Sequence, residues 1–299
     1  MASVRGVRTD VDAATRAAIE TAMAHGIVPD RCEVLQNGST LVLRLTESLV
    51  ARVVQDLDGP RQGMEWFARE NAVAQHLAAK GAPVIPMHAE MPPGPHEHSG
   101  YPINFWQYVQ RVEAEPDAAE AGRAMFSCHE VLRSFPGKLT HLELLNETSG
   151  VLDSVEQRKL FPSDTVALLR ERLRSSSAAL EHFPHQPLHG DAHMGNLMNT
   201  TIGLLWTDWE DTFSGPVEWD LASVIWNARV LEEDHESADA VLAAYRDAGG
   251  SLDEEAMKHA MIARAVVMTA WYPILYPDLS EERRERLKRR LEWLETGGV

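Results

Sequence analysis

"HGDAHMGN" occupies residues 189–196, and "DWED" follows at residues 208–211. The first stretch sets Asp191 among small or flexible neighbours and places Asn196 five residues later. Between the two stretches, "NLMNTTIGLLW" contains two apolar runs separated by a turn, which predicts a β-hairpin. Asn196 would begin this hairpin and Asp208 would end it. We therefore expect an amide oxygen and a carboxylate on the same side of the hairpin.

This set of residue types is suited to phosphoryl transfer. Oxygen ligands such as Asn196 and Asp208 suit Mg²⁺, which keeps water and substrate phosphates in its other coordination positions. Asp191 is not needed as a ligand and is free to accept a proton from a hydroxyl nucleophile. A base and a magnesium pair are two of the parts that phosphoryl transfer requires.

A cation and a carboxylate upstream supply the remaining part. Arg52 lies in the apolar run "LVARVV", and Glu70 shares the apolar face of a predicted helix over residues 63–81. A carboxylate that points inward needs a cationic partner or a hydrogen-bond network. We expect Arg52 to be that partner; the alternative is that both side chains reach solvent separately at the edge of a lobe.

At these residues the sequence resembles the aminoglycoside phosphotransferase and choline kinase family, the small-molecule branch of the protein-kinase-like fold. "HGDAHMGN" is similar to the family's catalytic loop, and "WTDWEDTFSGPVEWDLA" is similar to its second motif. The resemblance implies that Asp191 is the catalytic base and that Asn196 and Asp208 bind Mg²⁺. It also implies that Asp220 braces the site and that ATP or GTP is the phosphoryl donor. An aminoglycoside is the leading acceptor, with antibiotic resistance as the corresponding role.

Two features depart from the family pattern. The family often has Lys where this chain has Arg52, whose fork of donors differs from a point-charge ammonium. The turn "QNGST" at residues 36–40 has one glycine in place of a glycine-rich run. We expect Gly38 and Ser39 there to offer donors to the phosphates.

Three further residues are candidates around the same site. His189 is expected to brace the catalytic loop through its ring hydrogen bonds. In "FWQYV", Gln107 and Val109 are expected to offer backbone groups to the purine.

The order of predicted elements defines the fold class. Short β-branched or leucine-rich runs at residues 33–35, 40–45 and 49–54 predict an antiparallel meander, and a further strand is expected at 103–109. Long helical patterns dominate the rest, at residues 117–135, 164–181, 218–232, 235–248, 252–271 and 280–295. We therefore expect an α+β, two-lobed protein-kinase-like fold. Residues 1–109 would form a small antiparallel-sheet lobe that binds nucleotide, and residues 110–299 a larger, mostly helical lobe.

Charge and composition limit the kinds of molecule that this protein is expected to bind. The net charge of −17 over 299 residues argues against a nucleic-acid partner, because phosphate contacts need a basic surface. Residues 181–260 hold 16 acidic and 3 basic side chains, which favours a cationic small-molecule acceptor. No apolar run is long enough to span a membrane, and neither a signal peptide nor a disulfide framework is apparent, so we expect a cytoplasmic protein without a membrane partner.

Other functions stay open at this point. His182, His185 and His193 lie near Asp191 in the sequence, which is a pattern that metal-dependent hydrolases also use. A non-catalytic nucleotide-binding module on the same fold is a second alternative, although the base and both metal ligands are present. Within the kinase interpretation, choline, homoserine, a macrolide, a sugar or another metabolite could replace the aminoglycoside.

Overall fold

The computed structural model describes residues 11–55 and 63–297 of the chain. Two compact units are distinguished by their internal contacts. The first comprises Met1–Ala114 together with Met198–Glu210, and the second comprises Glu115–Leu197 together with Asp211–Val299. Among the described helices, none is long and apolar enough to cross a lipid bilayer.

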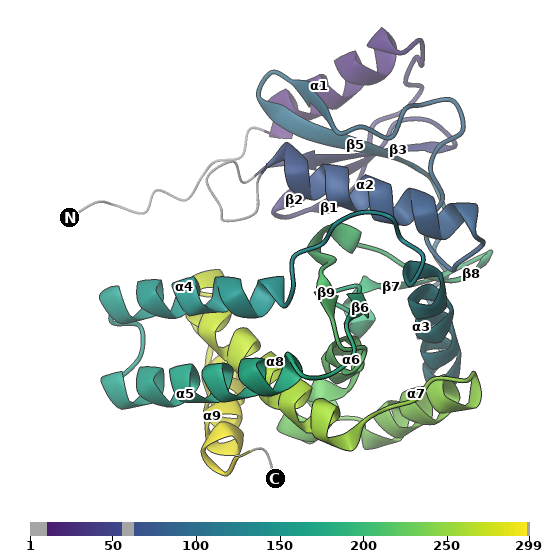
Figure 1. Cartoon of the computed structure of the whole chain (residues 1–299). Helices are drawn as coiled ribbons and strands as arrows, with labels where there is room; N and C mark the ends of the chain where they lie inside the picture. Colours follow the sequence, from purple (N-terminus) through teal and green to yellow (C-terminus); the bar gives the residue numbers. More distant parts are fainter. Residues whose placement is uncertain (1–10, 56–62, 298–299) are drawn as a thin grey trace. The chain divides into compact units, whose positions relative to one another are not determined.

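An antiparallel sheet forms the centre of the first unit (Figure 1). In the described residues its strand order is β1-β2-β3-β5-β4. The strands are β1 (Glu33–Asn37), β2 (Thr40–Arg44), β3 (Leu49–Val54), β4 (His96–His98) and β5 (Tyr101–Gln107). The predicted meander and the later strand are confirmed. The short strand β4 was not predicted, because its segment is rich in Pro, Gly and His.

Two helices and a hairpin complete the first unit. Helix α1 (Val11–Ala24) packs its alanines on the apolar core of the sheet. Helix α2 (Met64–Ala79) is followed by Gly81, whose φ of +75° favours glycine. The predicted hairpin is present as β7 (Leu197–Thr200) and β8 (Gly203–Trp206). Trp206 donates its amide to the Pro83 carbonyl at 2.8 Å, which ties the hairpin to the segment after α2.

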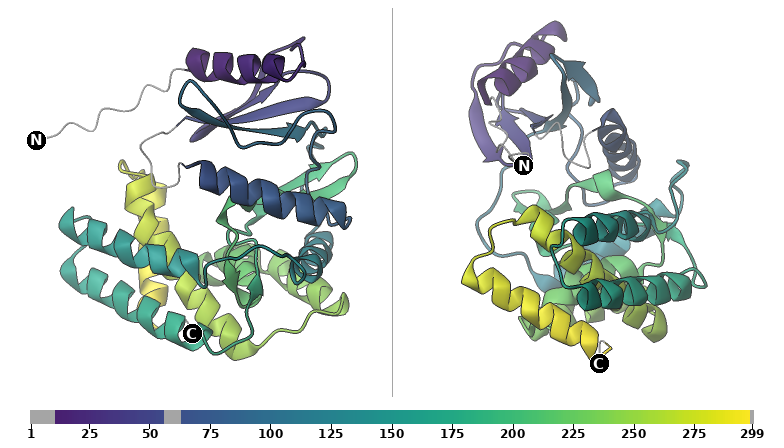
Figure 2. Two further views of the ribbon diagram at one scale, coloured as in Figure 1. Left: turned by 45° about the horizontal axis from the view of Figure 1, so that its top comes forward. Right: turned by 90° about the vertical axis from the view of Figure 1, so that its left-hand side faces the viewer.

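Helices make up most of the second unit (Figures 1 and 2). They are α3 (Ala118–Leu132), α4 (Glu143–Gln157), α5 (Ser163–Leu180), α6 (Glu218–Leu231), α7 (His235–Asp247), α8 (Glu254–Leu275) and α9 (Glu281–Glu295). Helix α8 packs against α4, α5, α6 and α9, and its alanine and valine side chains lie in the apolar core. Helix α3 packs against α7. The fold is therefore α+β, with a sheet-based unit followed by a mostly helical one, as predicted.

Short elements position candidate site residues in both units. Strand β6 (Gln186–Pro187) pairs with β9 (Ser214–Gly215). The 3₁₀ helix η1 (Met194–Asn196) follows the loop that contains Asp191. A second 3₁₀ helix, η2 (Trp209–Asp211), directly follows Asp208. Each 3₁₀ helix thus lies directly beside a loop that carries a candidate site residue.

Candidate active site

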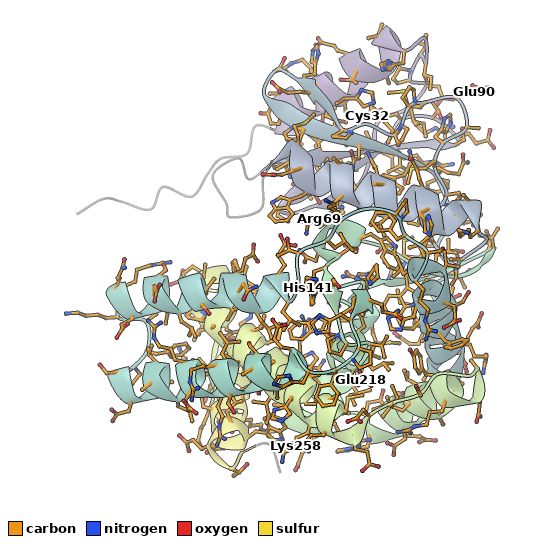
Figure 3. All side chains as sticks on the ribbon, viewed as in Figure 1. Cys32, Arg69, Glu90, His141, Glu218 and Lys258 are labelled. Atoms are coloured by element: carbon orange, nitrogen blue, oxygen red, sulfur yellow. The ribbon has the colours of Figure 1, made fainter. Side chains whose placement is uncertain are left out.

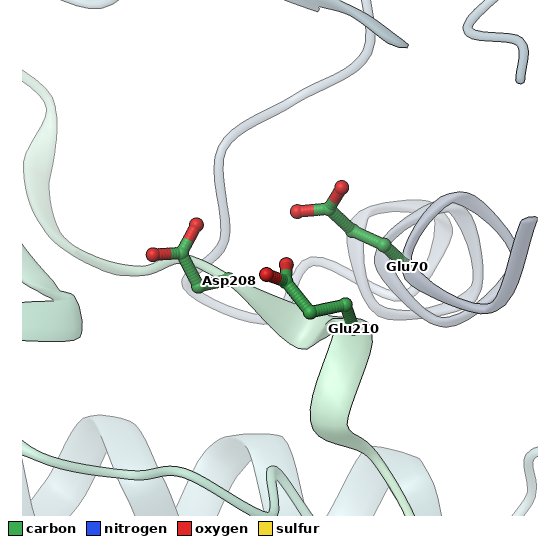
Figure 4. A group of neighbouring side chains, drawn as sticks. All are labelled: Glu70, Asp208 and Glu210. Atoms are coloured by element: carbon green, nitrogen blue, oxygen red, sulfur yellow. The ribbon is translucent and has the colours of Figure 1, made fainter. Parts of the chain in front are cut away.

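Arg52 is surrounded by carboxylates in the first unit. Its Nη1 lies 2.7 Å from Oε1 of Glu70, which confirms the pairing expected from the sequence. Both of its terminal nitrogens donate to the two carboxylate oxygens of Glu210, each at 2.7 Å. Asp208 Oδ1 lies 3.4 Å from Nη1. Figure 4 shows that the three side chains are neighbours.

Three carboxylates contact the Arg52 guanidinium in this cluster. Glu70, Asp208 and Glu210 each offer an oxygen within 4.8 Å of the others, and Arg52 is the cation that contacts all three. Burial raises the pKa of Glu70 from its ordinary 4.5 to about 8. Arg52 opposes that rise, and the charges of Glu210 and Asp208 add to it. One oxygen from each of the three carboxylates therefore lies close enough to the others for a single metal cation to contact all three.

The backbone between β8 and η2 sets the directions of the Asp208 and Glu210 side chains. Asp208 has a φ of +61°, a conformation that few non-glycine residues adopt, and its side chain is 44% exposed. Arg69 on α2, labelled in Figure 3, lies over the Trp66 ring at 4.5 Å. Arg69 also donates to the Glu210 carbonyl at 3.4 Å. The helix that carries Glu70 thus also contacts the segment that carries Asp208 and Glu210.

The remaining candidates for nucleotide binding lie on turns and at the end of β5. Gly38 and Ser39 form the exposed turn between β1 and β2, where their carbonyls accept hydrogen bonds from Gln55 at 3.0 and 2.9 Å. Gln107 donates its amide to the Pro86 carbonyl at 3.1 Å, so a contact of Gln107 with a purine would need another of its atoms. Val109 is half-buried just beyond β5. The nucleotide contacts of these four residues stay predictions.

In the second unit, α6 fixes the backbone of the loop around Asp191. Gly190 has a φ of +89°, and a Cβ there would lie 1.9 Å from the Asp211 carbonyl oxygen. The Trp219 ring nitrogen donates to the Gly190 carbonyl at 2.7 Å. The buried Asp220 carboxylate accepts the amides of His189 at 2.7 Å and Gly190 at 2.9 Å. The bracing role expected of Asp220 is confirmed.

Two side chains that the sequence did not single out extend this brace. His129 Nε2 lies 3.0 Å from Asp220 Oδ2 and must donate, because the carboxylate is an acceptor. The other ring nitrogen of His129 lies 2.9 Å from the Tyr245 hydroxyl. His189 is buried, and its Nδ1 accepts the amide of Asp191 at 3.4 Å, in agreement with the ring contact expected for it. Helices α3, α6 and α7 therefore all contribute to holding the loop.

The Asp191 carboxylate projects from the braced loop and is 30% exposed. Its Oδ1 lies 2.5 Å from Nη2 of Arg264 on α8, and its Oδ2 lies 3.5 Å from Nε2 of His193. Burial alone would raise the pKa of Asp191, but Arg264 and His193 outweigh it and hold that pKa below its ordinary range. Asp191 is therefore ionised at neutral pH, as a group that receives a proton must be.

Asn196 lies at the end of η1, five residues beyond Asp191. Its Nδ2 donates to the Asp191 carbonyl at 2.9 Å, so its amide oxygen is the atom suited to a metal. Asn196 belongs to the second unit and Asp208 to the first. Their joint role as magnesium ligands stays a prediction.

The histidines that suggested a hydrolase have other surroundings. His185 Nδ1 lies 2.9 Å from Nδ1 of His141, and His193 Nδ1 accepts the amide of Gly195. Over residues 11–55 and 63–297, the acidic group of Glu70 and its two neighbours is the one cluster with three potential metal ligands of the His, Cys, Asp or Glu type. This arrangement favours oxygen ligands over a histidine-rich metal site.

Comparison with known proteins identifies the family of this chain. The family model described as "Phosphotransferase enzyme family" matches residues 21–258. A thiamine kinase from Escherichia coli O17:K52:H18 is 29% identical over 197 residues, which cover 64% of this chain and 62% of the relative. The alignment thus spans about three-fifths of the length of that curated relative.

Solved structures share the fold over nearly the whole chain. An amicoumacin kinase in complex with AMP-PNP, Ca²⁺ and Ami has a TM-score of 0.72 at 15% identity, covering 97% of this chain and 96% of its own. A choline/ethanolamine kinase family protein from Mesorhizobium loti has a TM-score of 0.66 at 19% identity, covering 96% and 94%. Because the family model extends over most of the chain, the protein belongs to the phosphotransferase enzyme family, among whose structural neighbours are aminoglycoside phosphotransferases and choline kinases.

Proposed function

We propose that this protein transfers the γ-phosphoryl group of ATP or GTP to a hydroxyl group of a small molecule. The observation that carries the proposal is the Asp191 carboxylate, which is partly exposed, contacts Arg264 and His193, and lies on a loop whose backbone is held by Asp220. A carboxylate in that state can orient an acceptor hydroxyl and receive its proton. A non-catalytic module would have no need for a braced and ionised group at this position.

Arg52 is the group that we assign to the phosphate tail of the nucleotide. Its guanidinium is oriented by Glu70 and presents a fork that Glu210 occupies with two hydrogen bonds. A carboxylate and a phosphate present similar pairs of oxygens to such a fork. Phosphate oxygens of a bound nucleotide would therefore compete with Glu210 for Arg52. Gly38, Ser39, Gln107 and Val109 are assigned to the nucleotide on the family pattern.

The chemistry of the residues assigned to the metal suits a magnesium ion. Asp208 would supply a half-exposed carboxylate from a cluster of three, and Asn196 would supply an amide oxygen. Hard cations such as Mg²⁺ prefer oxygen ligands of these kinds. When bound, the ion would neutralise charge on the β- and γ-phosphates. Arg52 and Asp191 would then act on the phosphate tail and on the acceptor hydroxyl, respectively.

For the acceptor, we propose a hydroxyl compound that also carries positive charge. The excess of acidic residues over 181–260 supports this choice, and so does the similarity to thiamine kinases. Thiamine and the aminoglycosides share the two properties, a hydroxyl group and positive charge. Modification of an aminoglycoside would make the protein an antibiotic-resistance enzyme, whereas thiamine would make it a metabolic kinase.

The test is an acceptor panel with Mg–ATP and Mg–GTP, monitored by release of the nucleoside diphosphate. The panel contains thiamine, several aminoglycosides, choline, homoserine, a macrolide and a neutral sugar. Acceptor-dependent release is expected with at least one hydroxyl compound, at lower KM for the cationic members. The absence of acceptor-dependent release from the whole panel would contradict the proposal.

Metal dependence provides a second arm of the same experiment. Asp208→Ala should weaken the dependence of nucleotide binding on Mg²⁺ more than Asn196→Ala does, because the carboxylate brings charge and the amide does not. Asp247→Ala, which removes an exposed carboxylate on α7, is the matched control. Calorimetric titration with and without Mg²⁺ measures the effect. Bound zinc together with activity that survives removal of Mg²⁺ would favour the hydrolase alternative.

A further inference from the structure

Arg264 occupies an unusual position for an arginine. It lies in the middle of α8, where its neighbours Ala263 and Ala265 are fully buried, and its own side chain is 1% exposed. The helix there packs in the apolar core of the second unit. An arginine at such a position requires a partner, because an unpaired buried charge is strongly unfavourable.

The bonds of Arg264 do not make it a good stabiliser of the fold. Its Nη2 pairs with Asp191 at 2.5 Å, and its Nε is buried without a hydrogen-bond partner among the described residues. Its guanidinium carbon lies 5.8 Å from the centre of the Trp219 ring. Apolar residues often replace a buried ion pair without loss of stability, and an unsatisfied buried donor is unfavourable. Stability of the core therefore does not explain why this helix contains an arginine.

The contacts around Asp191 divide between two helices. Helix α6 holds the loop backbone, through Asp220 and Trp219. Helix α8 holds the carboxylate itself, through Arg264 on Oδ1. The second oxygen, Oδ2, has His193 at 3.5 Å, and the His193 side chain is 41% exposed. Of the two oxygens, Oδ2 is thus the one whose neighbouring side chain is exposed to solvent.

We propose that Arg264 is a positioning residue for phosphoryl transfer: it holds Oδ1 of Asp191, so that Oδ2 receives the hydroxyl proton of the acceptor. The inference rests on the proposed function, since it concerns the same carboxylate. Arg264 acts through Asp191 and does not itself contact the acceptor. No bond is made or broken at Arg264 during the transfer.

This role predicts that substitutions of Arg264 and of Asp191 change the stability of the protein in different directions. Removal of Arg264 leaves Asp191, which is partly exposed and can be hydrated. Removal of the Asp191 charge leaves Arg264 buried without a partner, which is the costlier state. Arg264→Met should therefore keep or raise the melting temperature, whereas Asp191→Asn should lower it.

The experiment compares Arg264→Met, Arg264→Lys, Asp191→Asn and the Met–Asn double variant with the wild-type protein. The matched control is Arg290→Met on α9, because Arg290 is also buried with an unpartnered Nε, yet contacts Trp226, Tyr272 and the Met268 carbonyl. Melting temperature, nucleotide Kd, acceptor KM and kcat are measured for each variant.

We expect Arg264→Met to lower kcat by about 10²-fold, the effect of misplacing a reacting group by about 1 Å, with nucleotide Kd and acceptor KM little changed. Arg264→Lys should recover part of kcat. In the Asp191→Asn background, loss of Arg264 should lower kcat no further, because it acts through that carboxylate. Arg290→Met should lower the melting temperature while kcat is retained.

Several results would overturn the assignment. These are a wild-type kcat in Arg264→Met, effects of Arg264→Met and Asp191→Asn on kcat that multiply in the double variant, or an Arg264→Met protein that does not fold. A wild-type protein that phosphorylates no acceptor would instead refute the proposed function, and the role of Arg264 with it. The wild-type measurement therefore separates the two failures.

Discussion

The two units hold their charged side chains in opposite ways. In the first, Arg52 contacts three carboxylates, and the pKa of Glu70 is raised to about 8, chiefly by burial. In the second, Asp191 lies between Arg264 and His193, and its pKa is held below its ordinary range. In one cluster three carboxylates contact the same guanidinium, and in the other a single carboxylate contacts a guanidinium and an imidazole.

The difference teaches what each cluster is suited to do. A cluster of several carboxylates around one guanidinium can exchange partners when a cation or a polyanion binds, which is what binding of a magnesium nucleotide involves. A carboxylate held by a buried guanidinium keeps one geometry and one protonation state, which a group that orients a hydroxyl requires. The following predictions test this contrast.

The largest effect is expected at Asp191. Asp191→Ala should lower kcat by roughly 10²–10⁴-fold, the usual range for loss of a general base. Nucleotide binding should be retained, because Arg52 and Glu70 are unchanged. Steady-state kinetics and calorimetry check the two parts separately. Near-wild-type turnover in a purified, folded variant would remove Asp191 from its role.

Substitution of Arg52 should weaken nucleotide binding and lower the folding stability of the protein. Arg52→Ala removes a hydrogen-bond donor from the buried Glu70 carboxyl and from Glu210, which should destabilise the protein by about 1–3 kcal/mol and abolish nucleotide binding. Arg52→Lys keeps the charge but loses the fork, so its effects should be smaller. Chemical denaturation and calorimetry measure them, with Arg31→Ala as the exposed control. Wild-type nucleotide affinity in Arg52→Ala would contradict the assignment.

The two clusters should make the stability of the folded protein depend on pH in opposite directions. Because the folded pKa of Glu70 lies above its ordinary 4.5, the folded state binds more protons between about pH 4.5 and 8. Stability of the nucleotide-free protein should fall as pH rises through this window, by at most about 1.4 kcal/mol per pH unit. Glu70→Gln should remove that slope. An unchanged slope in this variant would be evidence against a raised Glu70 pKa.

Asp191 should contribute in the opposite direction and at lower pH. Its folded pKa is depressed, so its contribution to stability is present above its ordinary value of 3.8 and is lost as pH falls below it. The same denaturation series extended to acid, with Asp191→Asn for comparison, measures this contribution. A wild-type protein that gains stability below pH 4 relative to the variant would contradict the pairing with Arg264.

The smallest effect is expected from salt. Many of the acidic side chains over 181–260 are exposed, namely Glu181, Glu232, Asp234, Glu236, Asp239, Asp247, Asp253, Glu254 and Glu255. Salt screens exposed charges, since the Debye length falls from about 10 Å at 0.1 M to about 3 Å at 1 M. The KM of a cationic acceptor should rise by about twofold over that range. A neutral acceptor preferred at every salt concentration would refute the charge argument and leave the kinase proposal intact.

Local patterns predicted much of the fold. The meander, the hairpin after Asn196 and the long helices of the second unit follow from apolar periodicity and turn residues. Helices α1 and α4 were not predicted. The inward face of α1 is built from small residues such as Ala14, Ala17 and Ala18, and α4 contains Gly150 together with several polar residues, so both patterns were weak.

In the site, a contact between two charged residues could be predicted where each residue interrupts an apolar pattern in its own segment. Arg52 and Glu70 each interrupt an apolar pattern, and their contact followed from the need to pair them. Arg264 interrupts "MIARAVV" in the same way, and that signal could have identified it. Its partner could not be predicted, because the contact between α8 and the Asp191 loop depends on tertiary packing. Glu210 lies in an ordinary acidic run, and no local pattern distinguishes it.

The most direct test is to follow the phosphoryl group itself. The wild-type protein is incubated with Mg–ATP or Mg–GTP labelled at the γ-phosphate and with the acceptor of lowest KM, and the products are separated and identified by mass spectrometry. Transfer to a hydroxyl predicts that the label appears in a phosphate ester of the acceptor, in equal amount to the nucleoside diphosphate formed. Label released only as inorganic phosphate, at the same rate with and without acceptor, would contradict it.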